Sequence, residues 1–366
     1  MRLALIVPGG VDRSGEVRVI PAFIALIERL ARRHDVEVFA LRQEQRPGTW
    51  SLGGATVHDA GSTRALWRTL GPLYAAHRRA PFDVVQSLFS GTPGLVACLA
   101  AARLRIPFTI HVAGGELQAL RQIGYGGRRR WLGRWRESFV LKRAAAVSAA
   151  SEPMIRSLRA LGIGAQRIPL GVDLARWPPR EPLPRPPGGP VRLVHTASIN
   201  LVKDQTTLLR ALALLARAGH GFHLDIAGED TLAGRIQALC TDLALGERVR
   251  FHGFQKQAQL HALVARAHVC VMSSLHEAGP LAVLEAAVLG VPTVGTRVGH
   301  IDEWAPDAAL AVPVNDPPAL AAALASLMSD EPRRLRLAQA AQARALAEDA
   351  DFTARAFENL YATIAG

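Results

Sequence analysis

Two series of alternating strand and helix patterns, separated by a proline-rich segment, constrain the fold of this chain most strongly. The first series begins at residues 2–8 and the second at residue 191. Seven of the fourteen residues at 177–190 are proline, which lacks a backbone N–H and stiffens the chain, so this segment reads as a linker. Alternating strands and helices are typical of a parallel sheet covered on both faces. We therefore expect an α/β fold with two Rossmann-like, doubly wound domains facing a central cleft.

The expected boundaries follow from this pattern. Residues 1–177 form the first domain, 178–190 the linker, 191–350 the second domain, and 351–366 a helix that packs back on the first domain. In the first series, strands are expected at 2–8, 36–39, 83–86 and 107–111, with helices near 20–30 and 93–104. In the second, strands are expected at 191–196, 223–227, 249–251, 269–273 and 292–295, with helices at 206–218, 232–245, 259–267 and 280–289.

Length and composition narrow the class of protein. The 366 residues suit two domains, and no run of about 18 apolar residues predicts a membrane-spanning helix. The apolar run at the N-terminus is too short for a signal peptide, so it is interpreted as a buried strand. Cys98, Cys240 and Cys270 lie far apart without a CxxC pair, which argues against a disulfide framework or a zinc site. A cytoplasmic protein is the expectation.

Positive charge is concentrated in the first half of the chain. Residues 1–180 hold 27 Lys and Arg against 12 Asp and Glu, whereas residues 181–366 hold 16 against 19. The segment 125–136 is rich in arginine, and Trp131 and Trp135 share one face if it is helical. That face suits an anionic membrane surface, a lipid-linked acceptor or nucleic acid, or it is a solvated arginine face over packed tryptophans.

The stretch 273–290 has the pattern of an anion-binding turn. A buried strand ends, a polar turn follows, and Pro280 is well placed to begin a helix. The free N–H groups from Leu281 onward and the helix dipole favour a negative charge. Gly279 lets a phosphate approach the backbone closely.

Two glutamates in this stretch are candidate ligands for a sugar nucleotide. Glu285 lies one to two turns into the helix, where its carboxylate can accept two hydrogen bonds from a ribose diol. Glu277 lies in the preceding loop, within reach of sugar hydroxyls. Glutamates are also common in first turns for structural reasons, so the spacing alone leaves both interpretations open.

This stretch resembles the Glu-x7-Glu signature of retaining GT-B glycosyltransferases, especially family 4. Other segments match that family in order, over about residues 165–310 and more loosely before them. They are the Pro-x-Gly-Val-Asp element at 169–173, the strand and loop at 194–205, the strand and loop at 248–254, and a turn like Gly-Gly-Ile-x-Glu at 298–303.

The resemblance implies roles for further residues. Lys203 would bind the donor diphosphate, and Ser198 stands where many members of the family carry an arginine. Phe254 would lie beside the nucleobase. His111 would face the transferred sugar, and Gly15 would lie in the loop near phosphate and acceptor. By this resemblance the catalytic set is His111, Lys203 and Glu277.

The implied activity is transfer of a sugar, with retention, from a nucleoside-diphosphate sugar of the UDP or GDP type to a hydroxyl of a sugar or lipid-linked acceptor. No metal or other cofactor is expected, and Asp349-x-Asp351 is interpreted as solvated surface. Cell-envelope polysaccharide or glycolipid synthesis at the inner face of the membrane fits the basic first half. The alternatives are a nucleotide-sugar epimerase of the same fold, a relative that lost catalysis, and a non-catalytic protein that binds nucleic acid or another anionic partner. Dehydrogenase and P-loop functions are excluded because neither half has their glycine or lysine motifs.

Overall fold

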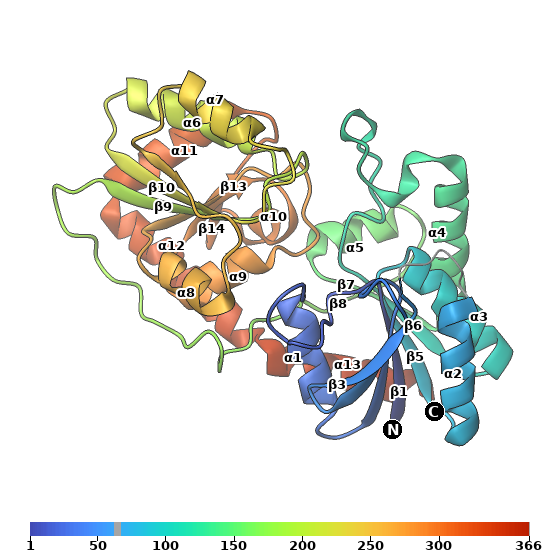
Figure 1. The fold of residues 1–366 in the computed structure, drawn as a ribbon. Helices are drawn as coiled ribbons and strands as arrows, with labels where there is room; N and C mark the ends of the chain where they lie inside the picture. Colours follow the sequence, from blue (N-terminus) through green and yellow to red (C-terminus); the bar gives the residue numbers. More distant parts are fainter. Residues whose placement is uncertain (62–66, 366) are drawn as a thin grey trace. The chain divides into compact units, whose positions relative to one another are not determined.

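The computed structural model describes residues 1–61 and 67–365. Contacts divide the chain into two compact units, Met1–Asp173 with Ala350–Gly366 and Leu174–Asp349 (Figure 1). The divisions fall at 173/174 and 349/350. Along the described ranges, no helix combines the length and apolar character that crossing a membrane requires.

The first unit is built on an eight-stranded sheet with the order β3-β4-β2-β1-β5-β6-β7-β8. All neighbouring strands are parallel except β3 and β4. The strands are β1 (Arg2–Val7), β2 (Asp35–Ala40), β3 (Gly48–Leu52), β4 (Ala55–Asp59), β5 (Val84–Leu88), β6 (Phe108–Val112), β7 (Ala146–Ala149) and β8 (Gln166–Arg167). The chain passes from β1 to β2 on one side and returns to β5 on the other, so the sheet has a switch point between β1 and β5.

The antiparallel hairpin of β3 and β4 corrects the expectation of a purely parallel sheet. Its turn consists of Gly53 and Gly54, both with positive φ, at 59° and 85°. A Cβ on Gly53 would lie 2.7 Å from Cγ of Glu28, so the turn needs glycine for both its backbone and its packing. A Gly-Gly pair between two short strand-like segments is typical of a hairpin. The expectation of alternating strands and helices did not take this signal into account.

Helices cover both faces of this sheet (Figure 1). They are α1 (Pro21–Leu30), α2 (Trp67–Arg79), α3 (Thr92–Leu104), α4 (Trp131–Arg143), α5 (Glu152–Arg159) and α13 (Ala350–Ala365), with the short 3-10 helices η1 (Arg121–Ile123) and η2 (Gly127–Arg129). The core of the unit is an apolar cluster of strand residues with α1 and α13.

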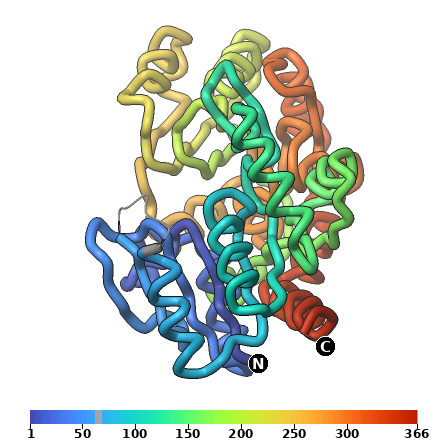
Figure 2. The backbone as a smooth tube through the Cα atoms, turned by 90° about the vertical axis from the view of Figure 1, so that its right-hand side faces the viewer, coloured from blue at the N-terminus to red at the C-terminus, as the bar shows by residue number. Residues whose placement is uncertain are grey.

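The last helix belongs to the first unit although it follows the second in sequence (Figure 1, Figure 2). Phe357 and Tyr361 of α13 are fully buried in the first core. Nε of Arg29 in α1 donates to Asp351 over 2.5 Å, and Nη2 of Arg29 donates to Asp173 over 3.1 Å. These contacts anchor both α13 and the end of the first segment to α1.

The second unit contains a fully parallel six-stranded sheet with the order β11-β10-β9-β12-β13-β14. The strands are β9 (Val191–Thr196), β10 (Phe222–Ala227), β11 (Val249–Phe251), β12 (Val269–Met272), β13 (Thr293–Thr296) and β14 (Ala309–Val312). The helices are α6 (Gln205–Arg217), α7 (Arg235–Asp242), α8 (Gln257–Ala265), α9 (Leu281–Val288), α10 (Gly299–Trp304), α11 (Pro317–Ser329) and α12 (Glu331–Ala347). The sheet reverses its strand order between β9 and β12.

The proline-rich segment 178–190, called the strap below, is packed against the second unit rather than free. The backbone N–H of Arg180 donates to the carbonyl of Val288 over 3.2 Å. The backbone N–H of Arg185 donates to the carboxylate of Glu331 over 2.8 Å. The strap therefore belongs to the second unit by its contacts.

Candidate functional site

The loops after β9 and β12 meet where the strand order of the second sheet reverses. The backbone N–H of Leu275 donates to the carbonyl of Val202 over 2.8 Å, and the Ser273 hydroxyl donates to the carbonyl of Lys203 over 2.8 Å. Outside the carboxyl ends of parallel strands, such a reversal is where α/β sheets bind ligands. The fold thus brings the 194–205 and 273–285 motifs together at one edge.

Lys203 and Glu277 form an ion pair across these two loops. Nζ of Lys203 lies 2.6 Å from Oε1 of Glu277, and the Ser274 hydroxyl donates to the same oxygen over 2.6 Å. Asn200 shapes the first loop, because its side-chain oxygen accepts the backbone N–H of Lys203 over 3.1 Å. The Glu277 side chain is only 10% exposed, so these two contacts take the place of most of its contact with water.

Glu285 is held in the interior at the start of α9. Pro280 is the N-cap and Leu281 the first helical residue, with Gly279 in the loop before them. Glu285 is 5% exposed, and burial raises the pKa of its carboxyl to about 8. Among the residues that the structure describes, no group hydrogen-bonds to this carboxyl. A buried carboxyl without a partner, beside free helix N–H groups, marks a place for a polar ligand.

Hydrogen bonds of the buried His195 and Gln205 side chains support the loop that contains Ser198. His195 is fully buried, its Nδ1 donates to the carbonyl of Val271 over 2.8 Å, and burial lowers its pKa to about 4. Its Nε2 therefore accepts the Gln205 amide N–H over 3.1 Å, and the same amide donates to the Ser198 carbonyl over 3.1 Å. The sequence does not predict a role for His195 or Gln205, because a contact between a strand and a helix ten residues later has no local signature.

Close backbone approaches fix the positions of these loops. Gly299 begins α10 with φ at 49°, and a Cβ there would lie 2.7 Å from Cδ of Pro280 and 3.2 Å from Cβ of Glu277. A Cβ on Gly228, after β10, would lie 2.0 Å from the carbonyl oxygen of Ala197. Glycine is therefore required where α10 and β10 meet the candidate site.

Phe254 lies apart from these tightly bonded loops. It follows β11, which two strands, β10 and β9, separate from β12, and it is 55% exposed. An exposed aromatic ring at the carboxyl edge of the sheet suits stacking on a base.

In the first unit, the loop after β1 is a compact structured turn. Asp12 is 3% exposed and accepts the backbone N–H of Ser14 over 2.9 Å and its hydroxyl over 2.7 Å. Arg18 also pairs with Asp12. Gly15 adopts φ at 67°, and its N–H donates to the carbonyl of Asp12 over 3.0 Å. Gly15 thus lies in a structured loop after β1, at the carboxyl edge of the first sheet.

His111 does not face an open surface. It is fully buried in β6, its Nδ1 lies 3.0 Å from the Ser148 hydroxyl, and its ring meets Phe357 of α13 edge-on at 5.3 Å. Burial lowers its pKa to about 3, so the imidazole is neutral. Side chains alternate between the faces of a strand, and this one points toward α13. In this structure the ring packs in the core of the first unit, and its Nε2 has no hydrogen-bond partner among the described residues.

Two buried glutamates, Glu116 and Glu137, lie close together near the carboxyl end of β5. Ser90 follows β5; its backbone N–H lies 3.3 Å from Glu116 and its hydroxyl donates to Glu137 over 3.1 Å. Burial raises the pKa of both carboxyls to about 7, and the charge of Glu116 adds to the effect on Glu137. Phe89, just before Ser90, has φ at 82°, a strained conformation that persists mainly at functional sites. The sequence does not predict this pair, because Glu116 and Glu137 are 21 positions apart.

Asp351, half of the Asp-x-Asp pattern, serves as the ion-pair partner of Arg29 described above. Within residues 1–61 and 67–365, no group of three His, Cys, Asp or Glu side chains is placed to hold a metal ion.

Comparisons with known proteins agree with this architecture. Residues 183–344 match the family described as "Glycosyl transferases group 1", and residues 21–171 match the "Glycosyl transferase 4-like domain". Together the two matches cover most of both units.

Curated relatives are similar over part of the chain. A glycogen synthase of Mycobacterium tuberculosis is 32% identical over 226 residues, 59% of this chain and 53% of the relative. A GDP-mannose-dependent alpha-(1-6)-phosphatidylinositol dimannoside mannosyltransferase of the same species is 32% identical over 175 residues, 46% of this chain and 45% of the relative. The matches thus span about half the length of these relatives.

Solved structures share the fold over nearly the whole chain. Sucrose-phosphate synthase from Thermosynechococcus elongatus superposes with a TM-score of 0.85 at 20% identity, covering 99% of each chain. Anabaena HepE, in complex with UDP and glucose, gives a TM-score of 0.74 at 16% identity, covering 99% of this chain and 100% of the other. At these identities the likeness establishes the two-domain GT-B fold.

Proposed function

Since this chain is a GT-B, family 4 glycosyltransferase-like protein, we propose that it transfers a sugar from a nucleoside-diphosphate sugar to a hydroxyl acceptor, with retention of configuration. The observation that carries this proposal is the Lys203–Glu277 ion pair between the loops after β9 and β12, with the buried Glu285 in the helix that follows the second loop. A cation, the start of a helix and two carboxyl groups at one edge match the parts of a sugar nucleotide.

The parts of the donor are assigned by chemistry. The diphosphate lies against Lys203 and the free N–H groups that begin at Leu281. The ribose diol binds Glu285, whose carboxyl has no other partner in the described chain. The sugar hydroxyls bind Glu277, and the base lies against Phe254.

The reaction follows from these positions. The bond between the sugar's anomeric carbon and the diphosphate oxygen breaks, and the acceptor oxygen bonds to that carbon on the same face. The acceptor's proton passes to an oxygen of the leaving diphosphate. Lys203 and the α9 N–H groups stabilise the charge that develops there, and Ser198, held by Gln205, adds its neighbouring backbone.

We also propose that this stabilisation requires no metal ion. The expected result is that a chelator such as EDTA leaves nucleotide binding and turnover unchanged. A loss of turnover that is restored by added Mg²⁺ or Mn²⁺ contradicts this part of the proposal.

The donor is proposed to carry UDP or GDP, and the acceptor to belong to an envelope polysaccharide or glycolipid. The names of similar proteins support both choices. HepE is described with UDP, and the mycobacterial mannosyltransferase is named for GDP-mannose and a phosphatidylinositol mannoside. A further relative is a putative colanic acid biosynthesis glycosyltransferase.

The exposed face of α4 supports a contact between the first unit and an anionic membrane. Trp131, Leu132 and Trp135 are 67%, 57% and 62% exposed. Arg129 and Arg130, just before the helix, are exposed too, and the first turn of α4 holds no acidic residue. Anionic headgroups complement both these arginines and the positive end of the helix dipole. The tryptophans suit the boundary between headgroups and acyl chains.

The direct test is turnover. The purified protein is incubated with UDP- and GDP-linked hexoses and a panel of hydroxyl acceptors, and nucleotide release and the anomeric configuration of the product are measured. We expect one donor class to give an α-linked product from an α-linked donor, and Glu277→Gln to lower the rate by about 100-fold or more. An inverted product excludes the retaining mechanism. Equal nucleotide release by wild type and variant contradicts the assigned site.

A further inference from the structure

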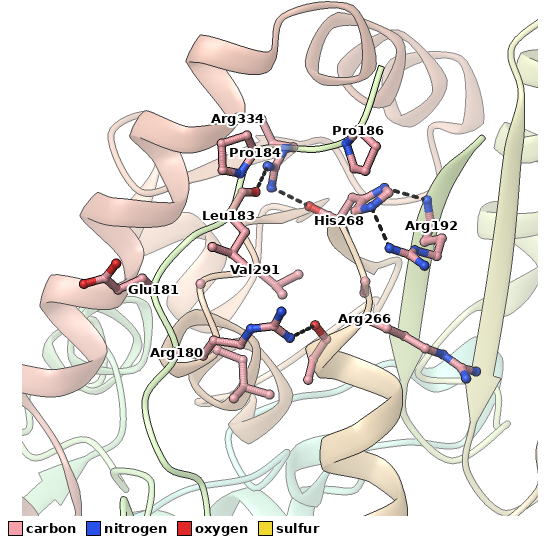
Figure 3. A pocket seen from close by; sticks show the side chains of 14 residues that line it. Arg180, Glu181, Leu183, Pro184, Pro186, Arg192, Arg266, His268, Val291 and Arg334 are labelled. Atoms are coloured by element: carbon pink, nitrogen blue, oxygen red, sulfur yellow. Dashed lines mark hydrogen bonds between the residues drawn. The ribbon is translucent and has the colours of Figure 1, made fainter. Parts of the chain in front are cut away.

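The second unit contains a basic pocket at the edge of its sheet opposite the candidate donor site (Figure 3). Its volume is about 310 Å³. Arg192 lies at the beginning of β9, His268 precedes β12, and Val291 precedes β13, so the pocket lies at the amino ends of these strands. The strap forms the opposite wall through residues 180–186. We call this cavity the arginine pocket.

Four arginines line the arginine pocket, and two of them have no carboxylate partner. Arg334 is 2% exposed and pairs with Glu331 at 2.6 Å, while Arg266 pairs with Asp225 at 3.1 Å. Within the described residues, Arg180 and Arg192 have no carboxylate at ion-pair distance.

The partners of these two arginines are neutral. Nη1 of Arg180 donates to the carbonyl of Ala265 over 2.8 Å, and Arg192 lies against His268. The lining includes one acidic residue, Glu181, whose carboxylate points away from the arginines in Figure 3. Two guanidinium groups therefore line one cavity without a compensating negative charge.

The surroundings of His268 point to a missing acceptor. Its Nδ1 lies 3.1 Å from the backbone N–H of Arg192, and its Nε2 lies 3.2 Å from Nη2 of the same residue. Both neighbours are donors, whereas a neutral imidazole has a single acceptor nitrogen. Burial and the charges of Arg192 and Arg334 lower the pKa of His268 to about 4, so the ring is neutral and one of its two contacts sets N–H against N–H. An anionic oxygen near Nε2 accepts from both groups and resolves this conflict.

We propose that the arginine pocket binds a small phosphate-bearing anion, as a second site apart from the donor site. Arg180 and Arg192 supply two planar guanidinium groups that suit phosphate oxygens, and the neutral His268 supplies a further N–H. The cavity is of the size of small-ligand sites. The strap supplies Arg180, so the ligand bridges the strap and the sheet of the second unit. This inference does not depend on the proposed transferase activity.

Calorimetric titration with pyrophosphate and with a hexose 6-phosphate tests this proposal, at constant ionic strength. Pyrophosphate can also bind Lys203, so the titrations are repeated in Lys203→Ala. We expect binding to persist in Lys203→Ala and to weaken by about tenfold or more in Arg180→Ala/Arg192→Ala, since hydrogen bonds to charged groups are lost. Arg217→Ala/Arg235→Ala removes the same charge elsewhere in the unit and should bind as wild type does.

Each other outcome overturns the proposal. Binding that is lost in Lys203→Ala but kept in Arg180→Ala/Arg192→Ala belongs to the donor site. Equal weakening in both double arginine variants shows a general charge effect. The absence of binding to a wild-type protein whose melting curve shows it folded excludes the site. A melting curve of the Arg180→Ala/Arg192→Ala variant checks that its loss of binding is not a loss of fold.

Discussion

At the scale of single residues, the ion pair of Lys203 and Glu277 lets the candidate site be examined without substrate. The Glu277 carboxylate is mostly buried, and Lys203 and Ser274 contact the same oxygen. Removal of the lysine leaves a buried carboxylate without its cation, and an uncompensated buried charge lowers the free energy of unfolding.

We predict a measurable coupling between these two residues. Lys203→Ala and Glu277→Ala each lower the free energy of unfolding, and the double variant loses less than the sum of the two, by about 1 kcal/mol or more. Urea unfolding of the four proteins measures this coupling. Additive losses contradict the pair.

Glu285 gives a prediction for pH dependence. Burial raises the pKa of its carboxyl from 4.5 to about 8, so the folded state holds the proton more tightly than the unfolded state. Its contribution to stability therefore falls as the pH rises from about 4.5 to about 8 and is constant above that. Glu285→Gln removes this loss, so the variant's melting temperature should exceed that of wild type at about pH 9 and approach it at about pH 5. A difference that does not change with pH contradicts the raised pKa.

The sequence predicts the position of a candidate site residue well where that position depends only on nearby residues in the chain. Lys203 and Glu277 lie in the loops after β9 and β12, and Leu281 and Glu285 lie in the first turns of α9, which follows the second loop. His111 was placed correctly on its strand, but the face toward which it points depends on α13, more than 200 positions away. Long-range packing of this kind has no signal in a single sequence.

At the scale of elements, α10 and the loop before α9 are held together by Gly299. Gly299→Ala places a Cβ against Pro280 and beside Glu277, at a positive φ. We expect a loss of about 1–3 kcal/mol in stability together with weaker nucleotide binding, because the loop must shift. Gly219→Ala, at a glycine that also has a positive φ but where a Cβ meets nothing within 4 Å, is the matched control. Equal effects of the two changes contradict the close approach.

The exposed face of α4 leads to a prediction about membranes. Trp131→Ser/Trp135→Ser should reduce flotation with vesicles that contain anionic lipid, and wild type should bind neutral vesicles poorly. Val314→Ser removes an exposed apolar side chain from the second unit and should leave flotation unchanged. Flotation of the tryptophan variant equal to that of wild type excludes α4 as the contact.

Most elements were predicted within a few residues, because buried parallel strands and amphipathic helices have strong periodic signals. The strands that were not predicted are β7 and β8 at one edge of the first sheet, the hairpin of β3 and β4 at its other edge, and β14 in the second sheet. The two strands of the β3–β4 hairpin are only five residues each, too short for a strong signal although burial alternates along both, and the Gly53-Gly54 turn is the clearest local mark of the hairpin. The sequence allowed several interpretations of the segment 125–136. Because Trp131 and Trp135 are exposed, the interpretation in which they pack beneath a solvated arginine face is wrong.

At the scale of the whole molecule, two doubly wound units each carry their polar loops at the carboxyl edge of the sheet. The first unit presents the Gly15 loop and the pair Glu116 and Glu137, and the second presents Lys203, Glu277 and Glu285. The sequence predicted two such units because the strand–helix alternation restarts after the prolines. It did not predict that the strap packs on the second unit, since proline content reports stiffness and not contact partners.

The central claim is that the second unit binds a nucleotide through Glu285, and melting curves with UDP, GDP, ADP and dTDP test it most directly. A ligand at 100 times its dissociation constant adds about 2.7 kcal/mol of stability. We predict that UDP or GDP raises the melting temperature of wild type, and that Glu285→Gln, although as stable or more stable, loses the response. If no nucleotide raises the melting temperature of wild type, or if the variant responds equally, Glu285 does not form part of a nucleotide site.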